Sequence, residues 1–179
     1  MPNRLTKGKA LAGAVNVPAG ALYIGDTAVT ATADELNRAA DVSGRVINGT
    51  AAGTLTITEA THDGKTVLLN RAGGFDVALP AATGSGATLR FVVATTTTSG
   101  GYIIRAAGND AFWGNTLQVT DNAGTVTGFK AGGGTVITLN GSTTAGIKGD
   151  VIDLQDILTD IWFVDMRTAG TGAEVTPFS

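Results

Sequence analysis

Apolar residues recur at every second position in many short segments of this chain, and each segment stops at glycine, asparagine or aspartate. Leu89, Phe91 and Val93 show the pattern after the Gly-Ser-Gly turn at 84–86. Alternation at period two is typical of a strand with one face in a core. About ten strands are predicted, within 55–58, 67–69, 75–79, 89–93, 102–104, 116–120, 125–130, 135–139, 151–154 and 161–164.

This spacing of short strands and turns predicts an all-β domain, either a sandwich, a jelly roll or a barrel-like fold. Residues 156–160 are an exception, because they also fit one helical turn. The strands follow no fixed repeat length, which makes a propeller or a β-helix less expected.

The composition favours a packed fold and argues against several functions. Hydrophobic residues make up 43% of the 179 residues, and there is no cysteine, so disulfides and thiolate chemistry are excluded. The net charge of −3 does not suggest a nucleic-acid partner. No segment reaches the roughly 20 continuous apolar residues of a membrane span. We expect no nucleic-acid and no membrane partner.

The first 31 residues are expected to form an extended arm. Glycine and proline interrupt every candidate element there, and the basic residues Arg4, Lys7 and Lys9 precede the first acid, Asp26. Several apolar residues accompany them, namely Leu11, Val15, Val17, Leu22 and Tyr23. These eight basic and apolar residues are candidates for binding a partner surface. The alternative is a solvated tail.

A short helix is expected next, within a segment spanning residues 32–48. Thr32 and Glu35 form a capping box, in which each side chain accepts a hydrogen bond from the other residue's backbone amide. Gly44 is suited to end a helix near 33–42. The β domain is then expected to occupy residues 49–179.

Residue patterns of known catalytic or metal sites are weak. His62 is the single histidine and lies in a turn-forming sequence, so we expect a turn residue and not a catalytic base. The series Asp150, Asp153, Asp156 and Asp160 does not follow an EF-hand loop and fits strand edges better than calcium ligands. We expect neither an enzyme nor a cofactor.

The two tryptophans allow two interpretations. Trp113 and Trp162 are suitable either for stacking on sugars or for packing in a core or a subunit contact, and we favour packing.

Several phrases resemble bacteriophage capsid decoration and head-fibre proteins. They are Val29–Asn37, with its Thr-Ala-x-Glu-Leu-Asn-like phrase, and Gly64–Asn70, Leu79–Gly86, Arg90–Val93, Phe112–Gly114, Trp162–Val164 and Thr176–Ser179. The resemblance covers most of residues 29–179 and does not include the first 28.

The resemblance implies a structural virion protein, made in the host cytoplasm, that decorates or cements the outer surface of a phage capsid. It implies a homotrimer whose N-terminal arm anchors to the major capsid protein while the β domain projects outward. The same helix phrase also occurs in tail fibres, so a tail-fibre or tailspike receptor-binding module is the alternative.

Overall fold

The structure of this protein is a computed structural model that describes residues 23–24, 26–30, 44–121 and 124–179. The chain divides into two compact units, Met1–Val42 and Ser43–Ser179. The second unit, called the β unit below, starts six residues before the domain boundary expected at residue 49.

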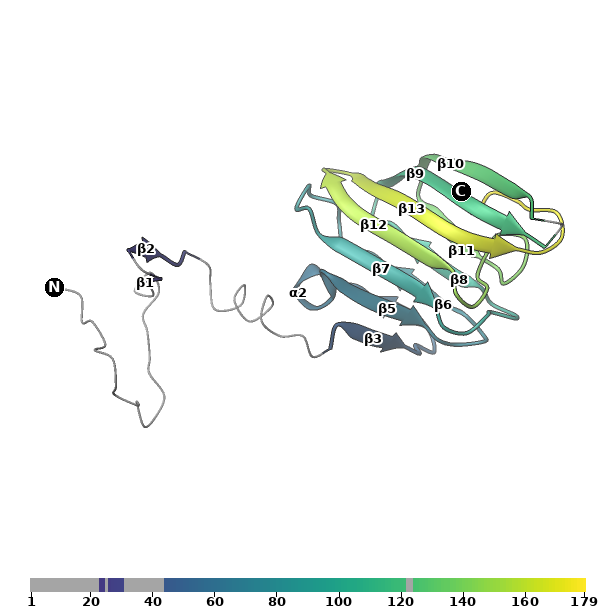
Figure 1. The fold of residues 1–179 in the computed structure, drawn as a ribbon, viewed down its shortest axis with the longest axis horizontal. Helices are drawn as coiled ribbons and strands as arrows, with labels where there is room; N and C mark the ends of the chain where they lie inside the picture. Colours follow the sequence, from purple (N-terminus) through teal and green to yellow (C-terminus); the bar gives the residue numbers. More distant parts are fainter. Residues whose placement is uncertain (1–22, 25, 31–43, 122–123) are drawn as a thin grey trace. The chain divides into compact units, whose positions relative to one another are not determined.

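The β unit is built almost entirely of strands (Figure 1). Its elements are β3 (Val46–Gly49), β4 (Thr54–Thr56), α2 (Glu59–His62), β5 (Lys65–Leu69), β6 (Phe75–Ala78), β7 (Thr88–Val93), β8 (Tyr102–Arg105), β9 (Ala111–Thr120), β10 (Val126–Gly134), β11 (Val136–Leu139), β12 (Val151–Leu158) and β13 (Ile161–Gly170). All ten predicted strands are present, and the all-β fold class is therefore confirmed.

The strands form two sheets that lie face to face. The larger sheet has seven strands in the order β10-β9-β13-β12-β7-β5-β3, and the smaller has four in the order β11-β8-β6-β4. Both sheets contribute to one buried core, for example Phe91 and Trp162 from the larger and Tyr102 and Ile137 from the smaller. This arrangement is a sandwich.

The first six strands of the sandwich wind as a coil. The chain passes alternately between the sheets from β3 to β8, and the strands within each sheet run parallel. The expectation that a β-helix is disfavoured is therefore wrong for residues 46–105, which form three turns of a flattened one. The strands of the larger sheet begin at Val46, Lys65 and Thr88, at unequal intervals of 19 and 23 residues. Because the turns differ in length, the coil leaves no repeat of fixed length in the sequence.

The remaining strands complete both layers. β11 lies antiparallel to β8, and β12 lies antiparallel to both β7 and β13. β9 and β13 pair in parallel over ten residues. The backbone of the last residues bonds to β11, where Ser179 accepts from the amides of Thr135 and Val136.

Two local expectations need correction. Residues 156–160 do not form a helical turn, because β12 extends to Leu158 and Asp160 takes the left-handed conformation (φ 63°) in the tight turn to β13. His62 is not in a plain turn but is the last residue of the four-residue helix α2.

The N-terminal expectations are tested only in part. A hairpin of β1 (Tyr23–Ile24) and β2 (Thr27–Ala28) lies within the segment expected as an arm. The helix expected near 33–42 lies outside the described residues, as do all the arm candidates except Tyr23.

Candidate functional site

The outer face of the seven-stranded sheet, which points away from the core, carries the candidate site. Inward and outward residues alternate along β9 and β13, so Phe112 and Trp162 are fully buried while their chain neighbours Trp113 and Phe163 are exposed. The strand register then shows which outward side chains form rows across the sheet.

One row begins with two aromatic residues, called the aromatic pair below. Trp113 and Phe163 are register partners on the parallel strands β9 and β13, and they are 46% and 42% exposed. The position beside Trp113 on β10 is Gly132, where an added Cβ would meet no atom within 4 Å. The indole therefore has open space on one side and Phe163 on the other.

The same row continues into a shallow groove of about 320 Å³. Phe163 is followed by Gln155 on β12 and Thr88 on β7. The next row supplies Asp153, Arg90 and Thr66. We call this the polar groove; its outward side chains are Thr66, Thr88, Arg90, Asp153, Gln155 and Phe163.

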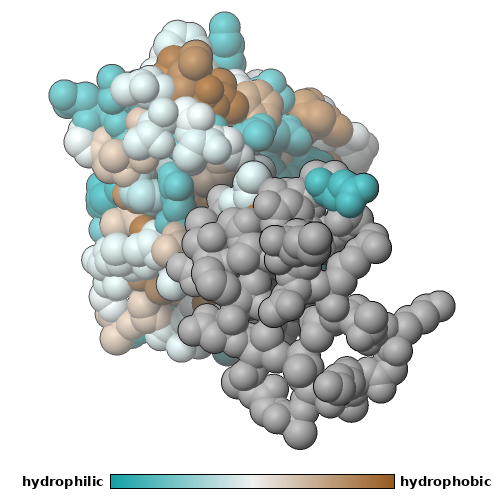
Figure 2. All heavy atoms as spheres, turned by 90° about the vertical axis from the view of Figure 1, so that its left-hand side faces the viewer, coloured by the Kyte–Doolittle hydropathy of each residue, from teal (hydrophilic) through white to brown (hydrophobic). Residues whose placement is uncertain are grey.

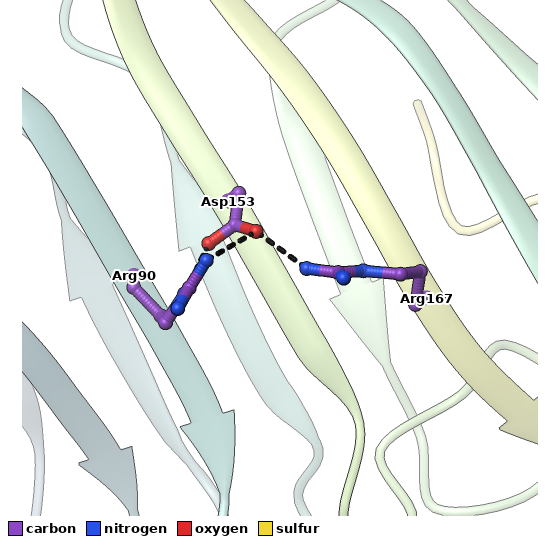
Figure 3. A network of polar contacts seen from close by, with 3 residues as sticks. All are labelled: Arg90, Asp153 and Arg167. Atoms are coloured by element: carbon purple, nitrogen blue, oxygen red, sulfur yellow. Dashed lines mark hydrogen bonds and ion pairs between the residues drawn. The ribbon is translucent and has the colours of Figure 1, made fainter.

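Two arginines hold the central carboxylate of the polar groove (Figure 3). Arg90 donates from Nε to Asp153 Oδ1 at 2.6 Å and from Nη2 to Oδ2 at 3.1 Å. Arg167 donates to the same Oδ2 at 2.7 Å. The hydrogen bond and the charge of Asp153 both raise the pKa of Arg90 above its usual value. Two guanidinium groups thus share one carboxylate, which leaves positive charge and free N–H donors at the surface.

A second apolar area lies farther along β9, at the edge of the sheet. Leu117, Val119 and Val126 are each more than half exposed, and Val126 is the register partner of Val119. We call these three the aliphatic patch. Lys130, Asn115 and Asp165 form a row between this patch and the aromatic pair.

Exposed apolar residues also occur at the other end of the strands. Figure 2 shows brown side chains at the upper end of the side it views, where most of the surrounding surface is pale or teal. Ile157 and Leu158, at the turn from β12 to β13, are exposed at 40% and 58%.

The acidic series expected at strand edges has mainly structural partners. Asp156 is fully buried and accepts from the backbone amides of Thr83, Gly84 and Ser85. Asp150 is buried and accepts from the amides of Gly146, Ile147 and Ala169. Each carboxylate therefore fixes a loop to the larger sheet.

The two buried carboxyls differ in pKa. Burial raises the pKa of Asp150 above its usual value, and its three backbone hydrogen bonds oppose the rise without cancelling it. Burial also acts to raise the pKa of Asp156, but the hydrogen bonds from residues 83–85 outweigh it and leave the pKa below its usual value.

The remaining candidates are accounted for as follows. His62 is buried, and its Nδ1 lies 2.6 Å from the hydroxyl of Thr61 and 3.1 Å from the amide of Thr58, so residues in α2 and directly before it hold the ring. Trp162 is packed in the core as expected. Of the eight partner-binding candidates only Tyr23 lies in the described part of the chain, in β1, so the expected set stays a prediction.

Sequence reasoning missed the polar groove and the position of Trp113. A signal for Trp113 is present, because Phe112-Trp113 and Trp162-Phe163 each place two aromatics side by side in a strand. In a strand of a two-layer fold only one of each pair can face the core. Arg90, Asp153 and Gln155 carried no such signal, since their proximity depends on strand pairing.

Comparison with protein-family models, with curated proteins and with solved structures finds no match for this chain. Within the ranges that the structure describes, no group of three or more histidine, aspartate or glutamate side chains is placed to hold a metal ion. No helix in those same ranges is long and apolar enough to cross a membrane.

Proposed function

We propose that this chain is a non-enzymatic structural virion protein that decorates or cements the outer surface of a phage capsid. The observation that carries the proposal is the aliphatic patch, which leaves Leu117, Val119 and Val126 more than half exposed near the edge of a seven-stranded sheet. The resemblance of residues 29–179 to decoration and head-fibre proteins supplies the biological setting.

The aliphatic patch is suited to contact between copies of the chain. Burying apolar surface contributes about 25 cal/mol per Å², so burial of these three aliphatic side chains against a second copy would stabilise the contact. Among the described residues β10 has a strand partner on one side only, which leaves its outer edge open for a neighbouring copy. Three copies in a homotrimer present three capsid-binding arms at once, so modest single contacts with the major capsid protein add up to tight attachment.

The interior of the β unit supports a structural role. The buried carboxylates of Asp150 and Asp156 accept backbone hydrogen bonds, and the ring of His62, the last residue of α2, is hydrogen-bonded to its neighbours. Rigid loops and a continuous core are what a protein outside the cell requires for persistence.

The test is the solution mass of the purified chain, measured by light scattering behind a sizing column. We expect a trimer, and we expect Leu117→Glu to shift the mass toward the monomer because it places a charge in the subunit contact. Leu158→Glu is the matched control, with the same exposed residue type at the other end of the sheet. A monomeric wild-type chain would remove the basis for the trimer.

Co-sedimentation with capsids of a phage that carries this chain separates the two virion roles. Saturable binding to capsids supports decoration. A trimer that leaves capsids bare and binds host cells instead would point to the alternative, a tail-fibre or tailspike receptor-binding module.

A further inference from the structure

We propose that the aromatic pair and the polar groove together form a binding site for an acidic oligosaccharide. The inference goes beyond the proposed function, because attachment to a capsid requires no such site. The row Lys130, Asn115 and Asp165 lies between the aromatic pair and the aliphatic patch, and it continues into Asp153 and Arg90 of the polar groove.

The side chains of the site lie in a line across four strands. Trp113, Phe163, Gln155 and Thr88 are successive register partners on four adjacent strands. Three strand spacings of about 4.8 Å make this row about 14 Å long. Such a row offers aromatic faces at one end and hydrogen-bonding groups at the other, as an elongated amphipathic ligand requires.

The aromatic pair has the chemistry that packing against sugar rings requires. Trp113 and Phe163 are register partners on adjacent strands and stay exposed, while the aromatic residues next to them in sequence fill the core. Sugar rings present C–H groups on their faces, and these pack on aromatic side chains, whose faces carry negative partial charge. Gly132 and the nearby Gly133 leave the flank of Trp113 free of side chains, so a flat ligand can approach the indole.

The charges around the polar groove favour an acidic ligand. The outward charges on these rows are Arg90, Arg167 and Lys130 against the two carboxylates Asp153 and Asp165. Positive charge therefore exceeds negative charge here, although the whole chain carries −3. Arg90 uses Nε and Nη2 to hold Asp153, so Nη1 remains available for a ligand carboxylate.

The polar side chains are also held in place. The two-point contact between Arg90 and Asp153 fixes the guanidinium plane, and Arg167 braces the carboxylate from the other side (Figure 3). Fixed donors lose little conformational entropy on binding, which favours a defined ligand orientation over loose ionic attraction.

The experiment is titration of the full chain with alginate oligosaccharides, which carry a carboxylate on every ring, and with neutral maltooligosaccharides of equal length. We expect saturable calorimetric binding of alginate and at least tenfold weaker binding of the neutral series. Equal binding of both series would overturn the acidic ligand, and no binding of either would overturn the site.

Variants assign the binding to named side chains. Trp113→Ala and Phe163→Ala should each weaken alginate binding at least tenfold, whereas Trp113→Phe should retain most of it because a ring remains. Arg90→Gln should remove the preference for alginate. Val175→Ala, at an exposed apolar residue outside the strands, is the control and should bind like wild type. Each variant is compared by thermal unfolding, so that loss of the fold is recognised.

Tryptophan fluorescence gives a second readout, which distinguishes ligand binding from loss of the fold. Trp162 is fully buried and Trp113 is exposed, so acrylamide quenching reports mainly on Trp113. Bound alginate should protect this signal in wild type. Unchanged quenching at saturating alginate would overturn the site. A change of oligomeric mass in Trp113→Ala would also overturn it, by making the aromatic pair a subunit contact.

Discussion

At the scale of single residues, buried carboxylates hold loops in place in this protein. Disulfides or metal ions serve that purpose in many other folds. Asp156 collects three backbone amides and the hydroxyl of Ser85, and thereby fixes the loop between β6 and β7 against β12. Charged acceptors form stronger hydrogen bonds than neutral ones. Without cysteine, the chain uses these bonds to restrain long loops.

Asp156→Asn should lower the free energy of unfolding at pH 7 by about 2 kcal/mol, because an amide replaces a charged acceptor facing several donors. The folded-state pKa of Asp156 lies below its unfolded value, so its contribution is complete above the unfolded value of about 3.9 and is lost as pH falls through the folded pKa. Urea unfolding at pH 7 and pH 3 should therefore show a smaller acid-induced loss in the variant than in wild type.

Asp150→Asn is the control of opposite sign. The folded-state pKa of Asp150 is raised, so this carboxyl favours the folded state most at pH below its unfolded pKa and less as pH rises through the folded one. Its removal should make the acid-induced loss of stability larger than in wild type. Equal pH dependence in the two variants would contradict the assigned directions.

At the scale of elements, the coil of β3 to β8 depends on corners that stack closely. The turn between β5 and β6 contains Gly73 and Gly74, and the turn between β7 and β8 contains Gly100 and Gly101. A Cβ on Gly74 would lie 1.9 Å from the carbonyl oxygen of Gly101. Successive turns of the coil can approach this closely only because both corners lack side chains.

Gly74→Ala should destabilise the β unit by about 3 kcal/mol or more, since it combines a backbone clash with a positive φ of 68°. Gly64→Ala is matched in φ, at 69°, but a Cβ there meets nothing within 4 Å. This control should cost only about 1–2 kcal/mol. Chemical denaturation of both variants measures the difference, and equal costs would mean that the stacked corners tolerate a methyl group.

The strands could be predicted from the sequence, whereas their pairing could not. Leu89, Phe91 and Val93 alternate in sequence, and all three are buried in β7. The alternation of apolar residues indicates which side chains of a strand point inward, but it does not indicate which strand lies beside it. Phe163 and Trp113, which are register partners on parallel strands, are 50 residues apart in sequence. Local sequence patterns could therefore not predict the candidate site.

At the scale of the whole molecule, the division at residues 42–43 separates the parts to which different tasks are proposed. The β unit holds the core, the aliphatic patch and the polar groove. Attachment to a capsid is proposed for the basic and apolar residues of the first 31, most of which lie outside the described residues. If the tasks are separate, removing one part should leave the other working.

A shortened chain that begins at Ser43 should therefore keep the urea unfolding midpoint of the full chain, because all the buried core residues among those described lie in Ser43–Ser179. It should also retain alginate binding. The same chain should fail to co-sediment with capsids, since it lacks Arg4, Lys7, Lys9 and the apolar residues beside them. A shortened chain that still covers capsids to full occupancy would place the capsid contact on the β unit and contradict the proposed role of the arm.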